Sequence, residues 1–424
     1  MKIVKLSPEQ FDNFSSNHPL HTYYQSSSYG NLMSLDGFTP YYYGFISDQN
    51  TLVGASLILV QKLFLGYNYA YAPRGFLIDY DNKELVADIT NRMKKFLSKN
   101  NIAFLKIDPP VVSNKRDKNG NILQSPYTND IIPFLQKIGY TYFGDNKFFG
   151  TLKPRWNAIL KVTGSSETLF KNFDPSVKNK IRKAQSRGVE ILQGNHTDIE
   201  TFYNFVAKKH YRKLDYYKKF ADSFGDNFEI YFAYLNTEAY LNNIKQIYEK
   251  ELEKNEELNE KIRNASLTNT SSEKLTNSKI QSDKTLAGYK KELELAPVLY
   301  TKYPGGIIIG ATAIIVEKHG IELVIEGQNS VYKKLLCPMF LTKWEIIKKY
   351  AQLGAVYFDL NGITGYFSNN NKYRGLNEMK LGFGADVTEY IGEFDLVINH
   401  TIYNLHKKTK LGKKAIKKSH DEAK

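Results

Sequence analysis

Residues 102–110 read Ile-Ala-Phe-Leu-Lys-Ile-Asp-Pro-Pro, an apolar run of strand length that ends in an aspartate and two prolines. This composition predicts a buried strand, and Pro109 favours its end. In the preceding residues 83–100, apolar side chains recur every three or four positions, which predicts an amphipathic helix. Residues 53–60 and 67–72 have the β-branched and aromatic composition of strands. Strand, helix and strand in this order indicate an α/β unit.

A similar order returns later in the chain. Residues 307–316 and 321–325 resemble two strands, residues 340–353 a helix, and residues 356–360 another strand. A chain of 424 residues is long enough for more than one domain. We therefore predict an α/β (α+β) protein of two similar halves, with the boundary near Lys153.

The middle of the chain differs in composition. Its apolar residues follow a narrow stripe on a Glu/Lys/Asn-rich background: Leu241, Ile244, Tyr248, Leu252, Leu258 and Ile262, then Leu286, Tyr289 and Leu293. Such a stripe is typical of a coiled coil, although one step of six breaks the heptad spacing. We predict an arm of two antiparallel helices with a polar tip at residues 268–272, stopped by Pro297. The alternative is a disordered charged linker.

The charge balance favours polyanionic partners. Lys and Arg total 58 and Asp and Glu total 44, a net charge of +14. Nucleic acid, an anionic membrane surface or a phosphorylated substrate would be attracted, although the charge also serves solubility. A single cysteine, Cys337, excludes an internal disulfide, and no metal-ligand spacing is present, so we expect no metal and no cofactor. No signal peptide or membrane span is visible, so a cytoplasmic protein is expected.

Basic residues gather in two places. A predicted helix presents four cations beside a core-facing stripe: Lys178, Lys180, Arg182 and Lys183. The C-terminal segment, residues 406–424, has seven lysines between positions 407 and 418: Lys407, Lys408, Lys410, Lys413, Lys414, Lys417 and Lys418. Phosphate binding by the helix, and contact of the tail with tRNA or anionic lipid, are the functional interpretations. A solvated helix face and a frayed tail are the alternatives.

Five other residues are candidates for a site. Asp108 and Arg74 each follow a predicted strand, the usual position of site residues in α/β folds. The alternatives are that Asp108 merely caps a loop and that Arg74 pairs with Asp79. Arg212 and Tyr216 are four residues apart and would share a helix face suited to a phosphate, with core packing of Tyr216 as the alternative. Lys380 is a cation among apolar neighbours, with an exposed edge strand as its alternative.

Several segments together resemble the Fem family of peptidoglycan bridge-forming aminoacyltransferases. They are Gln25-Ser26-Ser27-Ser28-Tyr29-Gly30, Tyr71-Ala72-Pro73-Arg74-Gly75, Lys106-Ile107-Asp108-Pro109-Pro110, Ile181-Arg182-Lys183-Ala184, Asp359-Leu360-Asn361-Gly362, Met379-Lys380-Leu381-Gly382-Phe383-Gly384 and Glu389-Tyr390-Ile391-Gly392-Glu393-Phe394-Asp395. Each segment alone is only weakly specific for the family, but the order of the segments and the inserted arm are more specific. The chain departs from the family in residues 31–34, Asn-Leu-Met-Ser, where many relatives carry a phosphate-contacting lysine, and in Phe76 and Met379.

The resemblance implies two GNAT-like (acyl-CoA N-acyltransferase) domains with an inserted antiparallel coiled-coil hairpin. The expected division is residues 1–153 for the first domain, residues 154–238 and 297–405 for the second, 239–296 for the arm and 406–424 for the tail. The implied donor is aminoacyl-tRNA, and the implied acceptor is the stem-peptide amine of a lipid-linked or UDP-linked peptidoglycan precursor. Peripheral contact with the inner membrane surface and a related Fem-type partner are further expectations.

An aminoacyl ester is already activated, so the enzyme has to align ester and amine, remove a proton and stabilise an oxyanion. We expect Lys380 to act near the ester or its oxyanion, and Asp108 to accept a proton from, or orient, the acceptor amine, unless the substrate assists its own proton transfer. Arg74, Arg212 and Tyr216 are expected to bind the precursor, with the last two matching the family's phosphate-binding pair. An acetyl-CoA-dependent N-acetyltransferase and a non-catalytic tRNA-binding protein remain alternatives.

Overall fold

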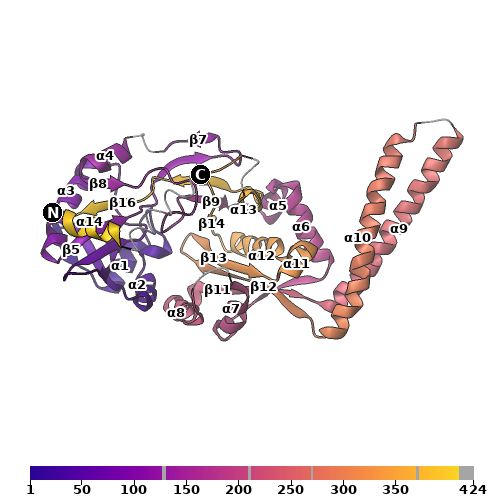
Figure 1. The fold of residues 1–424 in the computed structure, drawn as a ribbon, viewed down its shortest axis with the longest axis horizontal. Coiled ribbons are helices and arrows are strands. Elements are labelled where there is room, and N and C mark those ends of the chain that lie inside the picture. Colours follow the sequence, from indigo (N-terminus) through magenta and orange to yellow (C-terminus); the bar gives the residue numbers. More distant parts are fainter. Residues whose placement is uncertain (127–129, 209–211, 269–270, 369–371, 410–424) are drawn as a thin grey trace.

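The computed structural model describes residues 1–126, 130–208, 212–268, 271–368 and 372–409. Two mixed sheets with their helices lie side by side, and a long helix pair projects from the second (Figure 1). This confirms the predicted α/β class. Residues 410–424, which hold most of the predicted basic tail, lie outside the described residues.

The first sheet has the order β1-β2-β3-β4-β5-β16-β8 in the described residues. Its strands are β1 (Lys2–Lys5), β2 (Thr39–Ile46), β3 (Leu52–Lys62), β4 (Asn68–Ala72), β5 (Ile102–Ile107), β16 (Phe394–Val397) and β8 (Tyr140–Tyr142). β4 and β5 are parallel and end together, with Ala72 opposite Ile107. Helix α3 (Lys83–Lys99) connects them, as the apolar spacing predicts. The chain segments that leave these two strands therefore start at the same edge of the sheet.

The second sheet has the order β10-β11-β12-β13-β14-β9-β15-β6-β7. Its strands are β10 (Val189–Gln193), β11 (Phe228–Leu235), β12 (Ile307–Val316), β13 (Gly320–Gln328), β14 (Tyr357–Gly362), β9 (Trp156–Lys161), β15 (Asp386–Tyr390), β6 (Val112–Arg116) and β7 (Ile122–Gln124). β13 and β14 are the parallel pair here, and they are paired only from Gly320 opposite Tyr357 to Glu322 opposite Asp359. Beyond that point the two strands part.

The two sheets exchange strands across the predicted boundary. β6 and β7, from the N-terminal half, extend the second sheet beside β15. β16, from near the C-terminus, lies between β5 and β8 of the first sheet. Helix α14 (His400–Lys408) follows β16 and packs its Tyr403 against Phe104 of β5. These exchanges tie the two halves into one body.

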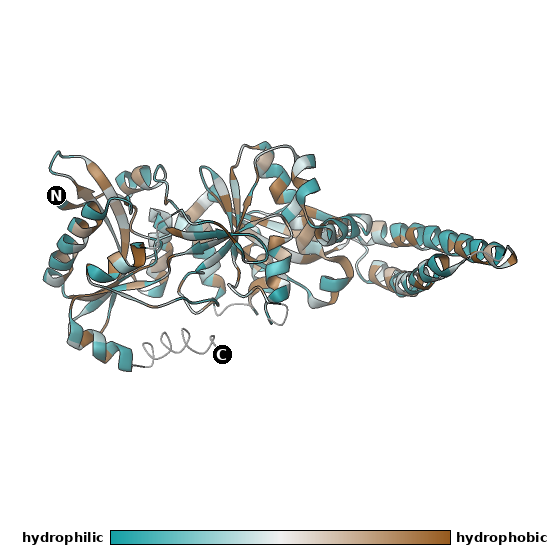
Figure 2. Cartoon of the chain, turned by 90° about the horizontal axis from the view of Figure 1, so that it is seen from above, coloured by the Kyte–Doolittle hydropathy of each residue, from teal (hydrophilic) through white to brown (hydrophobic). Residues whose placement is uncertain are grey.

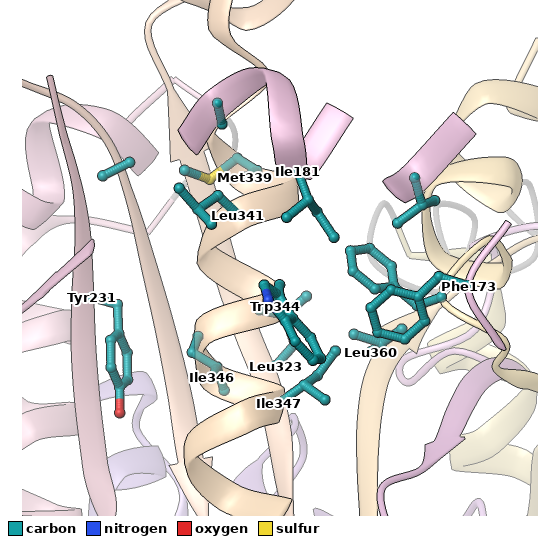
Figure 3. Packing of buried hydrophobic residues seen from close by; sticks show 14 of the residues in the cluster. Phe173, Ile181, Tyr231, Leu323, Met339, Leu341, Trp344, Ile346, Ile347 and Leu360 are labelled. Atoms are coloured by element: carbon teal, nitrogen blue, oxygen red, sulfur yellow. The ribbon is translucent and has the colours of Figure 1, made fainter. Parts of the chain in front are cut away.

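Helix α12 (Pro338–Gln352) organises the core of the second half. Its Trp344 meets the ring of Phe173 edge-on, with ring centroids 5.4 Å apart. Figure 3 shows Trp344 and Ile347 directed toward Phe173 and Leu360. The remaining α-helices of the described chain are α1 (Pro8–Ser15), α2 (Ser27–Met33), α4 (Ile131–Lys137), α5 (Ser166–Asn172), α6 (Pro175–Ser186), α7 (Ile199–Val206), α8 (Leu214–Phe224), α11 (Ser330–Leu336) and α13 (Arg374–Leu381).

An aromatic cluster joins the two halves. Tyr23, in the 3-10 turn η1 (Tyr23–Gln25), meets Phe224 of α8 edge-on at 5.8 Å between centroids. The same buried cluster contains Tyr29 of α2 and Phe228 of β11. Buried aromatic pairs contribute beyond their apolar area, so this contact fixes the position of one half against the other.

Two long helices stand at the position of the predicted insertion. α9 (Thr237–Leu267) and α10 (Glu273–Lys302) pack along each other and project from the body (Figures 1 and 2). Pro297 lies inside α10, so the predicted stop there is wrong. A proline removes one backbone hydrogen bond, and burial of Ala296 and Leu299 beside it offsets that loss.

A buried ion pair fixes the base of this helix pair. Glu292 of α10 accepts hydrogen bonds from Nε and Nη2 of Arg187 at 2.9 and 3.1 Å, and from the Tyr240 hydroxyl at 3.3 Å. We expect Glu292→Gln to destabilise the base by about 3–5 kcal/mol, because Arg187 would remain buried without its counter-charge. Hydrogen exchange at the base of α9 and α10 should therefore accelerate. Glu257→Gln, which breaks an exposed pair with Lys261, is the control and should leave exchange unchanged; equal protection in both variants would contradict the prediction.

Candidate active site

Asp108 lies at the end of β5 and holds the turn after β4. Its Oδ1 accepts a hydrogen bond from the backbone N–H of Arg74 at 2.7 Å, and its Oδ2 accepts one from the Tyr71 hydroxyl at 3.1 Å. The residue is 2% exposed, and burial raises the pKa of its carboxyl group while the Arg74 charge opposes that rise. Arg74 has a left-handed φ of 51°, a costly backbone conformation for a non-glycine residue. The hydrogen bond that the Arg74 backbone N–H donates to Asp108 helps to keep this conformation.

The Arg74 side chain reaches from the first half to the second. Its Nη2 donates to the carbonyl oxygen of Pro154 at 2.7 Å, and its guanidinium lies 4.7 Å from the ring centre of Tyr390. The structure shows no ion pair between Arg74 and Asp79, the alternative that the sequence allowed, in the residues it describes. Arg74 is therefore a buried cation whose side chain reaches from the first half to the second.

Lys153 is a functional candidate that the sequence did not single out. Its Nζ donates to the Tyr29 hydroxyl at 2.8 Å and lies 3.7 Å from the ring centre of Tyr24. Burial is the main cause that lowers the pKa of Lys153, to about 7, and the nearby charge of Arg74 lowers it further, whereas Asp108 opposes the change. In the sequence this lysine marks only a predicted boundary, because nothing local indicates what surrounds it.

Arg212 and Tyr216 meet, although not on one helix face. Arg212 precedes α8, which begins at Leu214, so the predicted shared face is wrong. The lysine at position 213 is the N-cap, so Arg212 lies outside the helix. The Arg212 guanidinium nevertheless lies 4.2 Å from the Tyr216 ring centre. Nη1 of Arg212 also donates to both carboxylate oxygens of Asp36, at 2.6 and 2.5 Å. The Arg212 charge contributes to lowering the pKa of Lys153, which puts the pair beside the same group of residues.

Two buried carboxylates occupy the corresponding strand positions of the second half. Glu322 and Asp359 face each other across β13 and β14 and line a cavity of about 470 Å³. Burial raises the pKa of both. Tyr390 also lines this cavity, so it opens beside the Arg74 guanidinium. In the sequence, Asp359 stands out only as part of a family-like segment, and Glu322 does not stand out. Each is a single acidic residue in a strand, which is a weak signal.

Lys380 lies in helix α13, so the edge-strand alternative is wrong. It is 7% exposed, and its Nζ donates to the carbonyl oxygen of Gly362 at 2.8 Å. It lines a cavity of about 360 Å³ at the place where β13 and β14 part, together with Pro154, Leu323 and Asn361. The amide of Asn361 donates to the Leu323 carbonyl at 2.9 Å and so bridges the parting strands.

The structure brings most of the predicted residues into one region. Pro154 lines the Lys380 cavity, and its carbonyl accepts the hydrogen bond from Arg74, which in turn binds Asp108. The charges of both Arg74 and Lys380 also act on the carboxyl group of Asp359. Asp108 and Lys380 do not contact each other in the described structure, but Arg74 and Pro154 lie between Asp108 and the cavity that Lys380 lines.

The predicted basic helix lies elsewhere. Arg182 and Lys183 of α6 line a groove of about 570 Å³ against α10, with Lys284 on the opposite wall. Lys178 donates to the Lys171 carbonyl at 3.0 Å, and Lys180 lies 4.5 Å from the Phe340 ring centre. None of these contacts joins the four cations to Asp108 or Lys380, so they form a separate basic surface.

This arrangement suits proton transfer and charge stabilisation. An amine whose pKa is near neutrality can exchange protons at physiological pH. Fixed cations beside small apolar cavities stabilise developing negative charge, because the surroundings screen them weakly. The geometry therefore fits a reaction between two bound substrates that needs acid–base chemistry and an oxyanion site.

Comparison with known proteins gives a consistent result. The model of the FemAB family matches residues 6–410. A protein named Aminoacyltransferase FemA from Staphylococcus epidermidis is 25% identical over 426 residues, covering 98% of this chain and 100% of that protein. Its namesake from Staphylococcus aureus is 22% identical over 418 residues, covering 95% and 97%. The crystal structure of FemX is similar in fold, with a TM-score of 0.72 and 18% identity, covering 96% of this chain and 99% of that one.

Proposed function

The chain belongs to the FemAB family as a Fem-type bridge-forming aminoacyltransferase, and we propose that it moves an amino acid from aminoacyl-tRNA to the stem-peptide amine of a peptidoglycan precursor. One observation carries the proposal of two bound substrates. The Lys380 cavity and the Arg74 guanidinium, which contacts Tyr390 of the cavity of about 470 Å³, meet at Pro154, so an ester bound in one cavity can face an amine bound in the other. Juxtaposition of this kind supplies much of the rate of an acyl transfer between activated ester and amine.

Lys380 is placed on the donor side. Its cavity is lined mainly by apolar groups, and its ammonium already binds one carbonyl oxygen, that of Gly362. A second carbonyl oxygen, that of the aminoacyl ester, would experience the same charge. We assign Lys380 to stabilising the oxyanion that forms there.

We assign Asp108 to orienting the groups on the acceptor side. Both of its carboxylate oxygens are engaged, by the Arg74 backbone and the Tyr71 hydroxyl, and the residue is buried. Its negative charge acts on Arg74 and Lys153. Asp108 thus positions the cations that face the acceptor.

Arg74, Arg212 and Tyr216 are assigned to the precursor. Arg212 is partly exposed and is held by Asp36, itself partly exposed, so a phosphate group could replace that carboxylate on the guanidinium. Tyr216 supplies a flat ring beneath the cation. Arg74 contacts Tyr390, which lines the cavity of about 470 Å³, and this contact supports its assignment to the precursor.

The fold-level proposals follow the same family. We propose that residues 1–153 and residues 154–238 with 297–405 are two GNAT-like units that exchange strands, and that residues 239–296 form a coiled-coil arm. Within the described chain, no helix combines the length and apolar composition needed to cross a bilayer. We place the reaction in the cytoplasm, with the basic tail, residues 406–424, supporting peripheral contact with the inner membrane surface. A related Fem-type protein is the proposed partner for the arm.

The basic surface of α6 is proposed to attract the tRNA, which makes its affinity depend on salt. With four phosphate contacts, log K should fall with log salt with a slope of about −3, which is a loss of about 60-fold between 50 and 200 mM. The double variant Lys180→Gln with Arg182→Gln should reduce the slope by about 1.5–2. The control is Lys95→Gln with Lys99→Gln, exposed on α3. Fluorescence anisotropy would measure tRNA affinity at each salt concentration. If both double variants kept the wild-type salt slope, the assignment of α6 to tRNA binding would be contradicted.

The function is tested by transfer with purified protein. Charged tRNA is mixed with either the lipid-linked or the UDP-linked precursor, and the product is analysed by mass spectrometry. We expect one amino acid to be added to the stem-peptide amine. Acetyl-CoA binding by calorimetry without transfer would favour an N-acetyltransferase, and equal binding of charged and uncharged tRNA without transfer would favour a non-catalytic RNA-binding protein.

A further inference from the structure

Lys153 occupies the point where the two halves of the site meet, and the roles assigned above leave it unused. It belongs to the segment that enters β9 of the second half, while its Nζ donates to the hydroxyl of Tyr29 in α2 of the first half. The ammonium lies against the Tyr24 and Tyr29 rings, at 3.7 and 4.9 Å from their centres. The next residue, Pro154, is the one that joins Arg74 to the Lys380 cavity.

We infer that Lys153 is the proton acceptor for the acceptor amine, an inference that rests on the aminoacyl transfer proposed above. A base must reach the substrate, and Lys153 is partly exposed whereas Asp108 is 2% exposed. A base must also have a free lone pair. Neutral Lys153 can donate one hydrogen to the Tyr29 hydroxyl and keep its lone pair for a proton. The Asp108 oxygens each keep a lone pair too, but the Arg74 backbone N–H and the Tyr71 hydroxyl hold them in place.

Burial favours the neutral amine, and the surrounding charges act in both directions. Desolvation is the largest cause of the lowered pKa of Lys153, about 7, and the cations Arg74 and Arg212 add to it. The carboxyl groups of Asp108 and Glu322 oppose it but do not cancel it. The titratable and charged groups that face or adjoin this cluster, element by element, are Tyr24 in η1, Tyr29 in α2, Arg74 after β4, Asp108 after β5, Arg212 before α8, Tyr216 in α8, Glu322 in β13 and Glu393 between β15 and β16.

The proton balance is complete without a further reactant. Neutral Lys153 takes one proton from the acceptor ammonium, and the resulting amine attacks the ester carbonyl, forming the C–N bond. Collapse of the tetrahedral intermediate breaks the bond between the acyl carbon and the ribose oxygen. The second proton from the nitrogen passes to that oxygen, and Lys153 returns its own proton to solvent. The products are an amide, a free tRNA hydroxyl and one released proton.

Lys153→Arg separates the base from a fixed charge, because arginine keeps the cation but cannot lose its proton. We expect Lys153→Arg and Lys153→Met each to lower kcat by about 100-fold, with the KM for the precursor nearly unchanged in the arginine variant. Added methylamine should partly restore Lys153→Ala. Lys147→Arg and Lys147→Met, in an exposed lysine of the same connecting segment, are the controls and should retain wild-type kcat. A Lys153→Arg enzyme within five-fold of wild type would overturn the inference.

A second readout is independent of transfer. NMR titration of the Lys153 side chain should show loss of its proton near pH 7, and the wild-type kcat/KM should rise with pH over the same range. A Lys153 amine that stays charged above pH 9 would reject the inference even if the enzyme is active. Failure of the proposed function is a different result, in which the wild type transfers nothing although Lys153 titrates near neutrality.

Discussion

Lys380→Met is expected to lower kcat for aminoacyl transfer by about 10²–10³-fold while the protein stays folded. Methionine has nearly the length of lysine, so the substitution keeps the packing of α13 and removes the charge. That charge lies 93% buried, beside the Gly362 carbonyl and next to a cavity of about 360 Å³. Removing one preorganised oxyanion donor has an effect of this size in other enzymes.

Single-turnover kinetics with preformed charged tRNA would measure the chemical step, so that product release does not hide the loss. Arg374→Met on the same helix is the matched control, since Arg374 is exposed and forms an ion pair with Glu378 one turn further along α13. It should stay within two-fold of wild type. If Lys380→Met lost less than three-fold, Lys380 would have no electrostatic role in transfer and the donor cavity would have to be placed elsewhere.

The sequence predicts the local units of this fold well. Period-3.6 spacing in residues 83–100 and apolar runs around it predict β4, α3 and β5, and parallel pairing then puts Arg74 and Asp108 at one edge. Lys380 could be identified because a cation among apolar residues is unusual. These signals are all local, so the sequence contains them directly.

The rest depends on contacts between distant residues. β16 pairs with β5 across almost 300 positions, and no local pattern specifies that partner for a four-residue strand. Lys153 acquires its chemistry only from Tyr29, Arg74 and Asp108, which tertiary packing brings to it. For Arg212 and Tyr216, the structure shows the predicted proximity of the two side chains. The predicted cause, a shared helix face, is wrong because α8 begins after Arg212.

Asp108→Ala is expected to reduce transfer by at least about 10³-fold, and Asp108→Asn by about 10²-fold. Alanine removes both hydrogen bonds and one of the negative charges near the buried Arg74, which destabilises the turn. Asparagine keeps an oxygen that can accept from the Arg74 backbone N–H, removes the charge, and offers Tyr71 an NH2 group in place of the second oxygen. The difference between the two variants therefore measures how much of the effect is position and how much is charge.

The charge has a consequence for pH that distinguishes the role of Asp108 from that of a base. The negative charge of Asp108 raises the pKa of Lys153 against the larger effect of burial, so its removal should move that pKa below about 7. In Asp108→Asn the acidic limb of the kcat/KM profile should therefore shift to lower pH, with a smaller plateau. If Asp108 itself accepted the proton, the limb would disappear, because asparagine does not titrate. A shifted limb would support Asp108 as the orienting group and Lys153 as the acceptor; a missing limb would reverse the two roles.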